Sequence, residues 1–283
     1  TNLEFLYLAV NLVSDLSPLA GLTDLQQLHL GGNQVSDLSP IAGLTELQNL
    51  YLIENQVSDL SPLAGLTNLE FLYLAVNLVS DLSPLAGLKK IQELYLYGNG
   101  VSDLSPLAGL TKLQELCLYQ NQVSDLSPLA GLTNLWSLWL MQNQIGDISA
   151  LVANSQAGGI GTGDNVYLQN NYLDLSAGSK TVTDIQTLIN NGATVSYWPQ
   201  NPVGPRIQTA VSLSAPSNAT LGQTVTVNST LRDGQGTPLS GAALSYLIDS
   251  TSFVGRNTTD ASGTASLSFK LTVDAGPHTL TTY

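Results

Sequence analysis

The sequence predicts a mainly β chain in two parts, a right-handed solenoid of short parallel strands with single helical turns, followed by a separate β domain. Two observations predict the solenoid. An asparagine recurs every 22 residues, as from Asn11 to Asn33, and a Leu-x-Leu segment precedes each of these asparagines. A third observation predicts the second part, because the chain is rich in Leu and Asn up to about residue 200 and in Thr, Ser, Val and Gly from about residue 206.

One copy of the repeat, Thr23 to Leu44, shows why the copies must stack. Seven of its apolar positions are expected to face inward: Leu25, Leu28, Leu30, Val35, Leu38, Ile41 and Leu44. Burying them contributes about 10 to 20 kcal/mol, whereas ordering the 22 residues of a copy costs on the order of 30 kcal/mol. A single copy should therefore not fold alone, and stacking must supply the remainder through shared burial and backbone hydrogen bonds.

Each copy begins with a strand and a turn. Gln27 to Leu30 alternates with period two and predicts a short strand, paired in parallel with the next copy about 4.8 Å away. The following asparagine can satisfy turn backbone groups through both its amide donors and its acceptor, which predicts a structural role. We expect nine strands and a ladder of such asparagines: Asn11, Asn33, Asn55, Asn77, Asn99, Asn121, Asn143 and Asn171.

A single helical turn is expected on the other side, with Ser39 as its cap, Pro40 at its first position and Gly43 at its end. Aligned carboxylates form a column there, which allows two interpretations. Calcium binding is one, because hard cations take oxygen ligands. Hydrogen bonding to each residue's own turn is the other, and it is favoured because one carboxylate per repeat is too few for a calcium site. No metal ligand is assigned. The column consists of Asp15, Asp37, Asp59, Asp81, Asp103, Asp125 and Asp147.

The repeat changes after Asn143, which predicts a capping repeat over about 157–200. Ala157 to Gly163 is rich in glycine and predicts a loop. Asp184 to Asn191 then predicts a helix with Ile185, Leu188 and Ile189 on one face, ended by Gly192 and followed by a last strand, Ala193 to Tyr197.

The repeat pattern L-x-x-L-x-L-x-x-N over residues 1–200 resembles the leucine-rich repeat, and the array looks like those of the internalins, a family of bacterial surface proteins. The resemblance implies a curved parallel sheet and an extracellular, non-catalytic protein that binds a partner through the concave face of that sheet. No ligand is implied residue by residue.

Aromatic side chains gather on the predicted concave face, between the inward leucines of the strands. Exposed aromatic patches usually mark interaction surfaces, although rings also stabilise a sheet through cross-strand contacts. A continuous column favours binding, with a protein, a glycan or copies of the chain itself as partner. The candidate binding residues are Phe5, Tyr7, His29, Tyr51, Phe71, Tyr73, Tyr95, Tyr97, Tyr119, Trp139 and Tyr167.

The second part, residues 206–283, shows six segments of alternating pattern with turn residues such as Asp233-Gly234 and Ser262-Gly263 between them. This part resembles bacterial immunoglobulin-like domains in two stretches of sequence, GQTVTVNSTLRDGQGTPLSGAAL and then TTDASGTASLSF. The resemblance implies a β-sandwich. The last strand of that sandwich is missing here, so we expect either a fragment of a longer chain or a strand donated by a neighbouring subunit. The six segments are Ala210 to Ser214, Thr224 to Leu231, Ala243 to Ile248, Phe253 to Thr258, Thr264 to Leu271 and Thr279 to Tyr283.

The charge and the reactive residues exclude several functions. A formal charge of −13, from 21 Asp plus Glu against 8 Lys plus Arg, repels nucleic acid and anionic lipid. No apolar run is long enough to insert into a membrane. His29 and His278 lie in different parts of the chain and Cys117 lies in a strand, so no catalytic pair and no cofactor are predicted.

The sequence therefore predicts an extracellular or cell-surface bacterial protein that binds a protein or glycan without catalysis. The alternative is a structural subunit of a self-assembling filament, tube or surface layer. Repeats 1–22 and 67–88 are identical, which suits a repetitive target or self-association, and an open sandwich edge would suit assembly.

Overall fold

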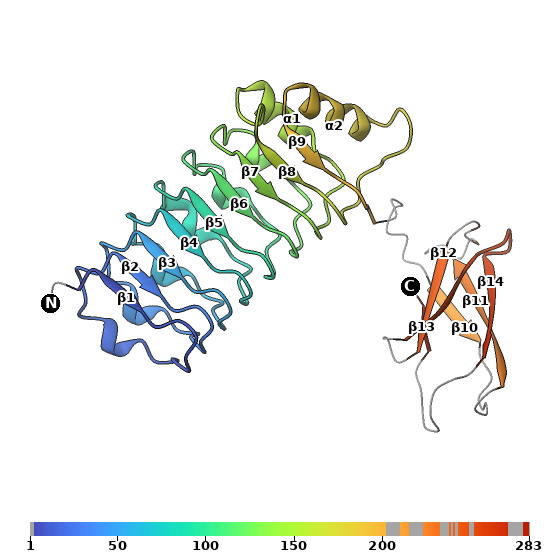
Figure 1. Ribbon diagram of the computed structural model, residues 1–283, viewed down its shortest axis with the longest axis horizontal. Helices are drawn as coiled ribbons and strands as arrows, with labels where there is room; N and C mark the ends of the chain where they lie inside the picture. The colour runs from blue at the N-terminus through green and yellow to red at the C-terminus, as the bar shows by residue number, and fades with distance from the viewer. Residues whose placement is uncertain are drawn as a thin grey trace. The chain divides into compact units, whose positions relative to one another are not determined.

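The computed structural model describes residues 3–201, 210–214, 223–232, 238, 240, 243–248, 252–270 and 280–282. The chain divides into two compact units, Thr1–Val203 and Gly204–Tyr283. Each unit is a separate arrangement of strands, as Figure 1 shows.

The first unit is built on one sheet of nine parallel strands, stacked in chain order with an unbroken register (Figure 1). Leu28 pairs with Leu50, and His29 with Tyr51. The prediction of nine parallel strands is confirmed, although the strand expected over Gln27 to Leu30 ends one residue earlier, at His29. The strands are β1 (Phe5–Tyr7), β2 (Gln27–His29), β3 (Asn49–Tyr51), β4 (Phe71–Tyr73), β5 (Glu93–Tyr95), β6 (Glu115–Cys117), β7 (Ser137–Trp139), β8 (Asn165–Tyr167) and β9 (Thr194–Ser196).

A short 3-10 turn follows in each of the first six repeats, which confirms the expected helical turn but not its cap. The Ser39 side chain makes no capping bond. Instead the Asp37 carboxylate, two residues before Ser39 in the sequence, accepts a hydrogen bond from the Ser39 backbone N–H at 2.8 Å. The turn ends at Ile41 rather than Gly43. The turns are η1 (Ser17–Leu19), η2 (Ser39–Ile41), η3 (Ser61–Leu63), η4 (Ser83–Gly87), η5 (Ser105–Leu107) and η6 (Ser127–Leu129).

The core of this unit is a set of leucine columns shared between successive repeats. All seven inward positions of the copy from Thr23 to Leu44 are at most 1% exposed. They belong to a single cluster that runs from Leu16 to Ala193. Since each leucine packs against the same position in the repeats before and after it, burial is completed only by stacking.

The framework asparagines bond across the boundary between repeats. Asn77 donates to the carbonyls of Leu52, at 2.8 Å, and Leu74, at 3.1 Å, and accepts the N–H of Val57 at 2.9 Å. One amide thus pairs backbone groups of its own repeat and of the preceding one. The same three-way pattern holds for Asn33, Asn55, Asn99, Asn121, Asn143 and Asn171.

The residue before each framework asparagine turns the chain out of the sheet in a left-handed conformation. Gly32 (φ 68°) and Gly98 (φ 65°) adopt it without strain. Val10 (φ 57°) and Val76 (φ 53°) adopt it although β-branched residues disfavour it. The turn geometry is therefore imposed by the stacked repeat rather than by the local residue.

Two helices and the last strand close the C-terminal end of the unit. Helix α1 (Ser149–Gln156) replaces the 3-10 turn of the seventh repeat, and the expected loop over 157–163 follows it. Helix α2 is Lys180–Asn190, so it begins four residues earlier than predicted; Ser179 caps it by accepting the Val182 N–H. Ile185, Leu188 and Ile189 share one face of α2 by their spacing, with Ile185 and Leu188 buried and Ile189 at its edge, 39% exposed.

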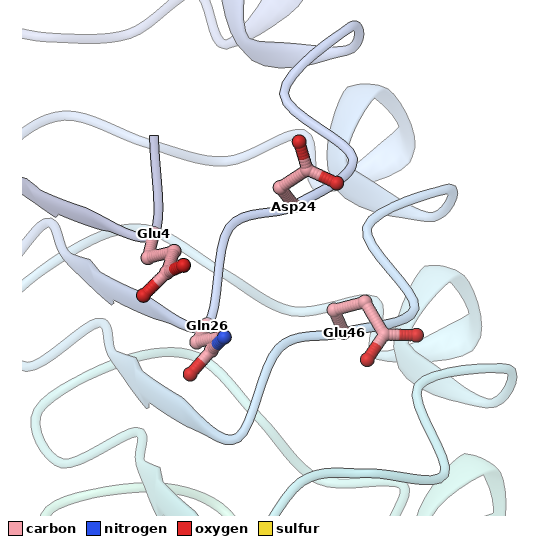
Figure 2. A pocket seen from close by; sticks show the side chains of 4 residues that line it. All are labelled: Glu4, Asp24, Gln26 and Glu46. Carbon is pink, nitrogen blue, oxygen red and sulfur yellow. The ribbon is translucent and has the colours of Figure 1, made fainter. Parts of the chain in front are cut away.

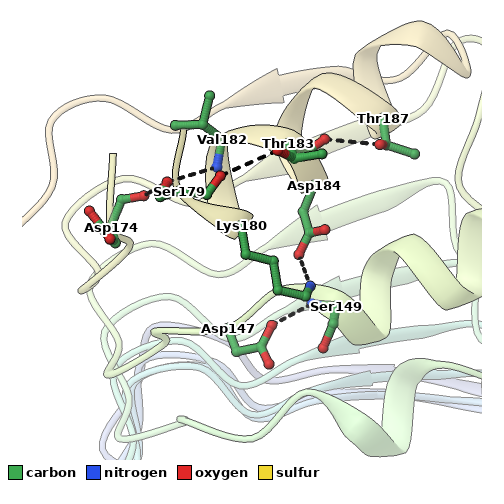
Figure 3. A network of polar contacts seen from close by, with 9 residues as sticks. All are labelled: Asp147, Ser149, Asp174, Ser179, Lys180, Val182, Thr183, Asp184 and Thr187. Atoms are coloured by element: carbon green, nitrogen blue, oxygen red, sulfur yellow. Dashed lines mark hydrogen bonds and ion pairs between the residues drawn. The ribbon is translucent and has the colours of Figure 1, made fainter. Parts of the chain in front are cut away.

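An ion pair lies at the start of α2, beside the last aspartate of the repeat column, as Figure 3 shows. Lys180 donates to the Asp184 carboxylate one turn along the helix. The Asp147 carboxylate, which accepts the Ser149 N–H at 2.8 Å, lies on the other side of Lys180 and contributes to raising the pKa of that amine. The acidic column of the repeats thus ends against the one lysine of α2.

The second unit contains two antiparallel sheets of three strands, ordered β10-β11-β14 and β13-β12-β15. All six segments predicted as strands contain one. In β11 the pattern alternates, with Val225 and Val227 buried and Thr226 between them exposed. Gly263 (φ 74°) makes the turn predicted at Ser262-Gly263, whereas Asp233-Gly234 lies outside the described residues. The strands are β10 (Ala210–Ser214), β11 (Thr224–Arg232), β12 (Ala243–Ile248), β13 (Ser252–Thr258), β14 (Thr264–Lys270) and β15 (Leu280–Thr282).

Candidate functional site

The solvent side of β1–β9, here called the sheet face, brings most of the predicted aromatic residues together. The last residue of each strand faces this side, and the parallel register places it beside the same residue of the next strand. His29 stacks on Tyr51 with ring centroids 4.0 Å apart. Tyr51 and Tyr73, and then Tyr73 and Tyr95, stack at 4.6 Å. These four rings form one continuous stack, here called the aromatic ladder.

Other predicted residues extend the sheet face at its two ends. Phe5 and Tyr7 contact His29 at 5.3 and 5.1 Å. Toward the other end, Trp139 and Tyr167 are 4.8 Å apart and tilted. Tyr97 stacks on Tyr119 at 4.6 Å in a second column, two residues further along each repeat. Phe71 lies two residues before Tyr73 in β4, in a third column, and has no ring contact among those found in the described residues.

The ladder is only partly open to solvent, because its rings cover one another. Tyr7 is 62% exposed at the end of the column, whereas the stacked rings from His29 to Tyr95 are half-buried. Cys117 is the last residue of β6 and so belongs to the same outward column, but it is buried, at 4% exposed, and burial raises its pKa to about 11. The expectation of a continuous exposed column is therefore corrected: the rings offer edges and polar tips, and the column is interrupted at Cys117.

Two carboxylates that the sequence analysis did not single out are bonded to the ladder. The Tyr73 hydroxyl donates to Glu93, and the Tyr95 hydroxyl donates to Glu115 at 2.6 Å. Burial and these bonds raise the pKa of both tyrosines well above the ordinary range, so their hydroxyls remain protonated donors. A sequence signal existed, since Glu-Leu-Tyr and Glu-Leu-Cys recur at 93–95 and 115–117.

A second acidic region lies at the edge of the sheet where the first strands begin. Glu4, Asp24, Gln26 and Glu46 line a pocket of about 450 Å³, as Figure 2 shows. All three acids are exposed. The pocket adds negative charge beside the ladder.

Each aspartate of the repeat column accepts hydrogen bonds from the serine two residues later in the same turn. Asp15 accepts the Ser17 N–H at 2.8 Å and the Ser17 hydroxyl at 2.9 Å, and these bonds hold the pKa of Asp15 below its ordinary value. The corresponding N–H bond is 2.8 Å in each of the other six repeats. Of the two interpretations of the column, these bonds support the one in which each aspartate serves its own turn. Among the described residues, no group of three or more His, Cys, Asp or Glu side chains is placed to hold a metal ion.

Four apolar side chains beside the framework asparagines are exposed, and the sequence analysis did not identify them. Val10 and Leu12 are 84% and 80% exposed, and Val76 and Leu78 are 43% and 66% exposed. They occupy equal positions in the two identical repeats. The sequence could have revealed them, because the residues just before and just after the framework asparagine are apolar here and are glycine, glutamine or glutamate in most other copies.

Neither α-helix in the described part of the chain combines the length and the apolar character needed to span a bilayer. Together, the stacked repeats and the aromatic and acidic sheet face define the class of structure: a repeat solenoid with a broad, chemically distinct surface.

Comparison with known proteins agrees with this class. The family model described as "Leucine Rich repeats (2 copies)" matches residues 1–43, 45–87, 67–109, 89–131 and 111–153. The chain therefore belongs to the leucine-rich repeat family.

Two solved structures are similar to this chain in both sequence and fold. Internalin C2 from Listeria monocytogenes is 34% identical, with a TM-score of 0.60 over 68% of this chain and 80% of that one. An internalin (inlF) from the same organism is also 34% identical, with a TM-score of 0.54 over 68% of this chain and 62% of that one. The solenoid is thus similar to the internalins, as predicted. No match was found among curated proteins.

Proposed function

We propose that this chain is a non-catalytic binding protein that engages a protein partner through the sheet face of its leucine-rich repeats. The aromatic ladder is the observation that carries the proposal. Four stacked rings with two bonded carboxylates present a rigid, half-exposed surface, and rings of this kind dominate binding energy at protein interfaces. The resemblance to internalins supports an adhesin-like role.

The stacking favours a protein over a glycan as the partner of the ladder. A sugar ring would lie flat on an aromatic face, but neighbouring rings about 4.6 Å apart already cover those faces. The ring edges remain, together with tyrosine and glutamate oxygens. Such a mixed surface suits the apolar and hydrogen-bonding groups of a protein.

The charge of the first unit favours a basic partner and disfavours contact between copies. Residues 1–203 contain 17 acidic and 4 basic side chains, so this unit carries the whole net charge of −13. The bases are Lys89, Lys90, Lys112 and Lys180, and none of them lies in β1–β9, all of which are described. Two acidic faces would repel one another, whereas a face rich in Lys and Arg would be attracted.

The resemblance to internalins also supports an extracellular or cell-surface location in a bacterium.

The second unit, with its two antiparallel three-stranded sheets, is compatible with the immunoglobulin-like sandwich that the sequence suggests. The comparisons give no support to the alternative, a structural subunit of a filament or layer.

Capture of partners by immobilised protein tests the proposal. Wild-type chain is compared with the triple variant Tyr73→Ala, Tyr95→Ala, Trp139→Ala, and retained proteins are quantified by mass spectrometry. We expect at least a tenfold loss of specific partners, because three rings of the sheet face are removed. The fold should persist, since the core is formed by leucines beneath the sheet.

The control is the variant Val182→Ala, Ile189→Ala, which removes two exposed apolar side chains from α2. This variant should retain partners as the wild type does. Equal capture by wild type and the triple variant of the sheet face, with circular dichroism showing that both are folded, would contradict the proposal.

A further inference from the structure

A pocket of about 420 Å³ lies at the C-terminal end of the sheet face, beyond the aromatic ladder. Its lining includes Tyr119, Met141, Gln142, Gln169, Asn170 and Trp198. This volume is within the range of small-molecule sites in proteins. The pocket belongs entirely to the first unit.

Four of the lining residues occupy the same position in successive rungs of the solenoid. Tyr119, Met141 and Gln169 each follow a strand by two residues. Trp198 continues this column, because Tyr167 pairs with Ser196 and the Asn170 N–H donates to Pro199 at 2.6 Å. Tyr119 and Trp198 are therefore three strand spacings apart, about 14 Å. Met141 and Gln169 form the floor between them.

The two aromatic walls differ from the rings of the ladder because they have uncovered surface. Tyr97 stacks on one face of Tyr119, on the side away from the pocket. Trp198 is 74% exposed and has no ring contact among those found in the described residues. An open aromatic face beside the Met141 side chain can hold a flat ligand with an apolar side.

Three of the lining residues carry side-chain amides. The Oε1 atom of Gln169 is buried and has no hydrogen-bond partner. Leaving a buried acceptor unpaired carries a free-energy penalty, and a ligand with a hydroxyl or N–H donor would remove that penalty. Gln142 and Asn170 add further amide groups at the rim. None of the lining residues is charged.

From this combination we propose that the pocket binds a neutral sugar ring. A pyranose has an apolar face that stacks on tryptophan and hydroxyls that pair with amides, one of which would satisfy Gln169 Oε1. The lack of charge in the lining disfavours acidic sugars. This site is separate from the ladder, so it stands whether or not the ladder binds a protein.

Titration of the full chain with three neutral trisaccharides, chitotriose, cellotriose and maltotriose, tests the proposal. Tryptophan fluorescence and saturation-transfer NMR are recorded up to about 10 mM sugar, ten times the dissociation constant of a millimolar site. We expect at least one trisaccharide to bind saturably. Trp198→Ala should weaken that binding at least tenfold, and Trp136→Ala, which removes a 43% exposed tryptophan outside the pocket, should not change it.

Gln169→Leu separates recognition from folding. It removes the unpaired buried acceptor, so the unfolding midpoint should stay the same or rise while sugar binding falls at least tenfold. The proposal is overturned if none of the three sugars binds, or if Gln169→Leu or Trp198→Ala binds as tightly as the wild type. Binding of a proline-rich peptide to the pocket, when none of the sugars binds, would also overturn the proposal and identify a peptide site.

Discussion

At the scale of single residues, the framework asparagines hold neighbouring repeats together because each amide serves backbone groups of both. Asn77 is 7% exposed and joins Leu52, Val57 and Leu74. Asn11 is exposed and donates only to Leu8 and Ala9 of its own repeat among the described residues. The same residue type therefore has two very different environments.

Replacing Asn77 by Ala should lower the free energy of unfolding by about 2 to 4 kcal/mol, since it leaves buried backbone groups unpaired. Asn11→Ala should cost less than about 1 kcal/mol. Urea denaturation measures both. Equal effects would show that the bonds between repeats contribute little.

His29 gives the ladder a dependence on pH. Burial in the stack lowers the pKa of His29 below 6.5, so the unfolded chain binds the proton more readily than the folded one. The stabilising effect of neutral His29 is complete above about pH 6.5 and is lost as the pH falls below that value. The aspartates with lowered pKa titrate below 3.8 and do not overlap with this window.

We therefore expect the unfolding temperature to fall between pH 7.5 and pH 5.0 by more in the wild type than in His29→Phe, which keeps a ring in the stack. Differential scanning calorimetry at both values tests this. His278 is common to both proteins and cancels in the comparison. An identical pH response would show that stacking does not disfavour the protonated ring.

At the scale of elements, helix α2 covers the last repeats with a narrow apolar face. Leu188 is fully buried, whereas the adjacent Ile189 is 39% exposed. The amphipathic pattern identified the helix, but its start at Lys180 depends on Ser179, which also donates to the Asp174 carbonyl at 2.6 Å. That loop contact cannot be recognised from the periodicity.

Leu188→Ala should destabilise the end of the array by about 2 to 5 kcal/mol through the cavity it leaves. Hydrogen exchange should quicken in β8 and β9 and remain slow in β3 and β4, because repeats contact only their neighbours. Ile189→Ala is the control and should change little. Uniform loss of protection along all strands would instead indicate a single cooperative unit.

At the scale of the whole molecule, the net negative charge belongs to the first of the two units, because the acidic and basic side chains of the second are equal in number. The acidic groups near the ladder should attract a basic partner and speed its association. Glu93 and Glu115 belong to the sheet face, whereas Asp103 and Asp125 belong to the turns that follow it.

Association of a captured partner should slow by roughly tenfold between about 0.05 and 0.5 M salt, because screening shortens the reach of the field. Glu93→Gln with Glu115→Gln should slow association at low salt. Asp103→Asn with Asp125→Asn removes the same charge elsewhere and should have a smaller effect. Stopped-flow kinetics would contradict the charge argument if the rate were independent of salt and of both double variants.

The sequence by itself determined the solenoid, its nine strands, its leucine core and the alternating strands of the second part, because these depend on local periodicity. The tertiary structure decided which side chains cooperate. Stacking half-buries the ladder, buries Cys117, pairs Glu93 and Glu115 with tyrosines of the preceding strands, and brings Trp198 beside Gln169. These outcomes depend on contacts between repeats, so no single repeat encodes them.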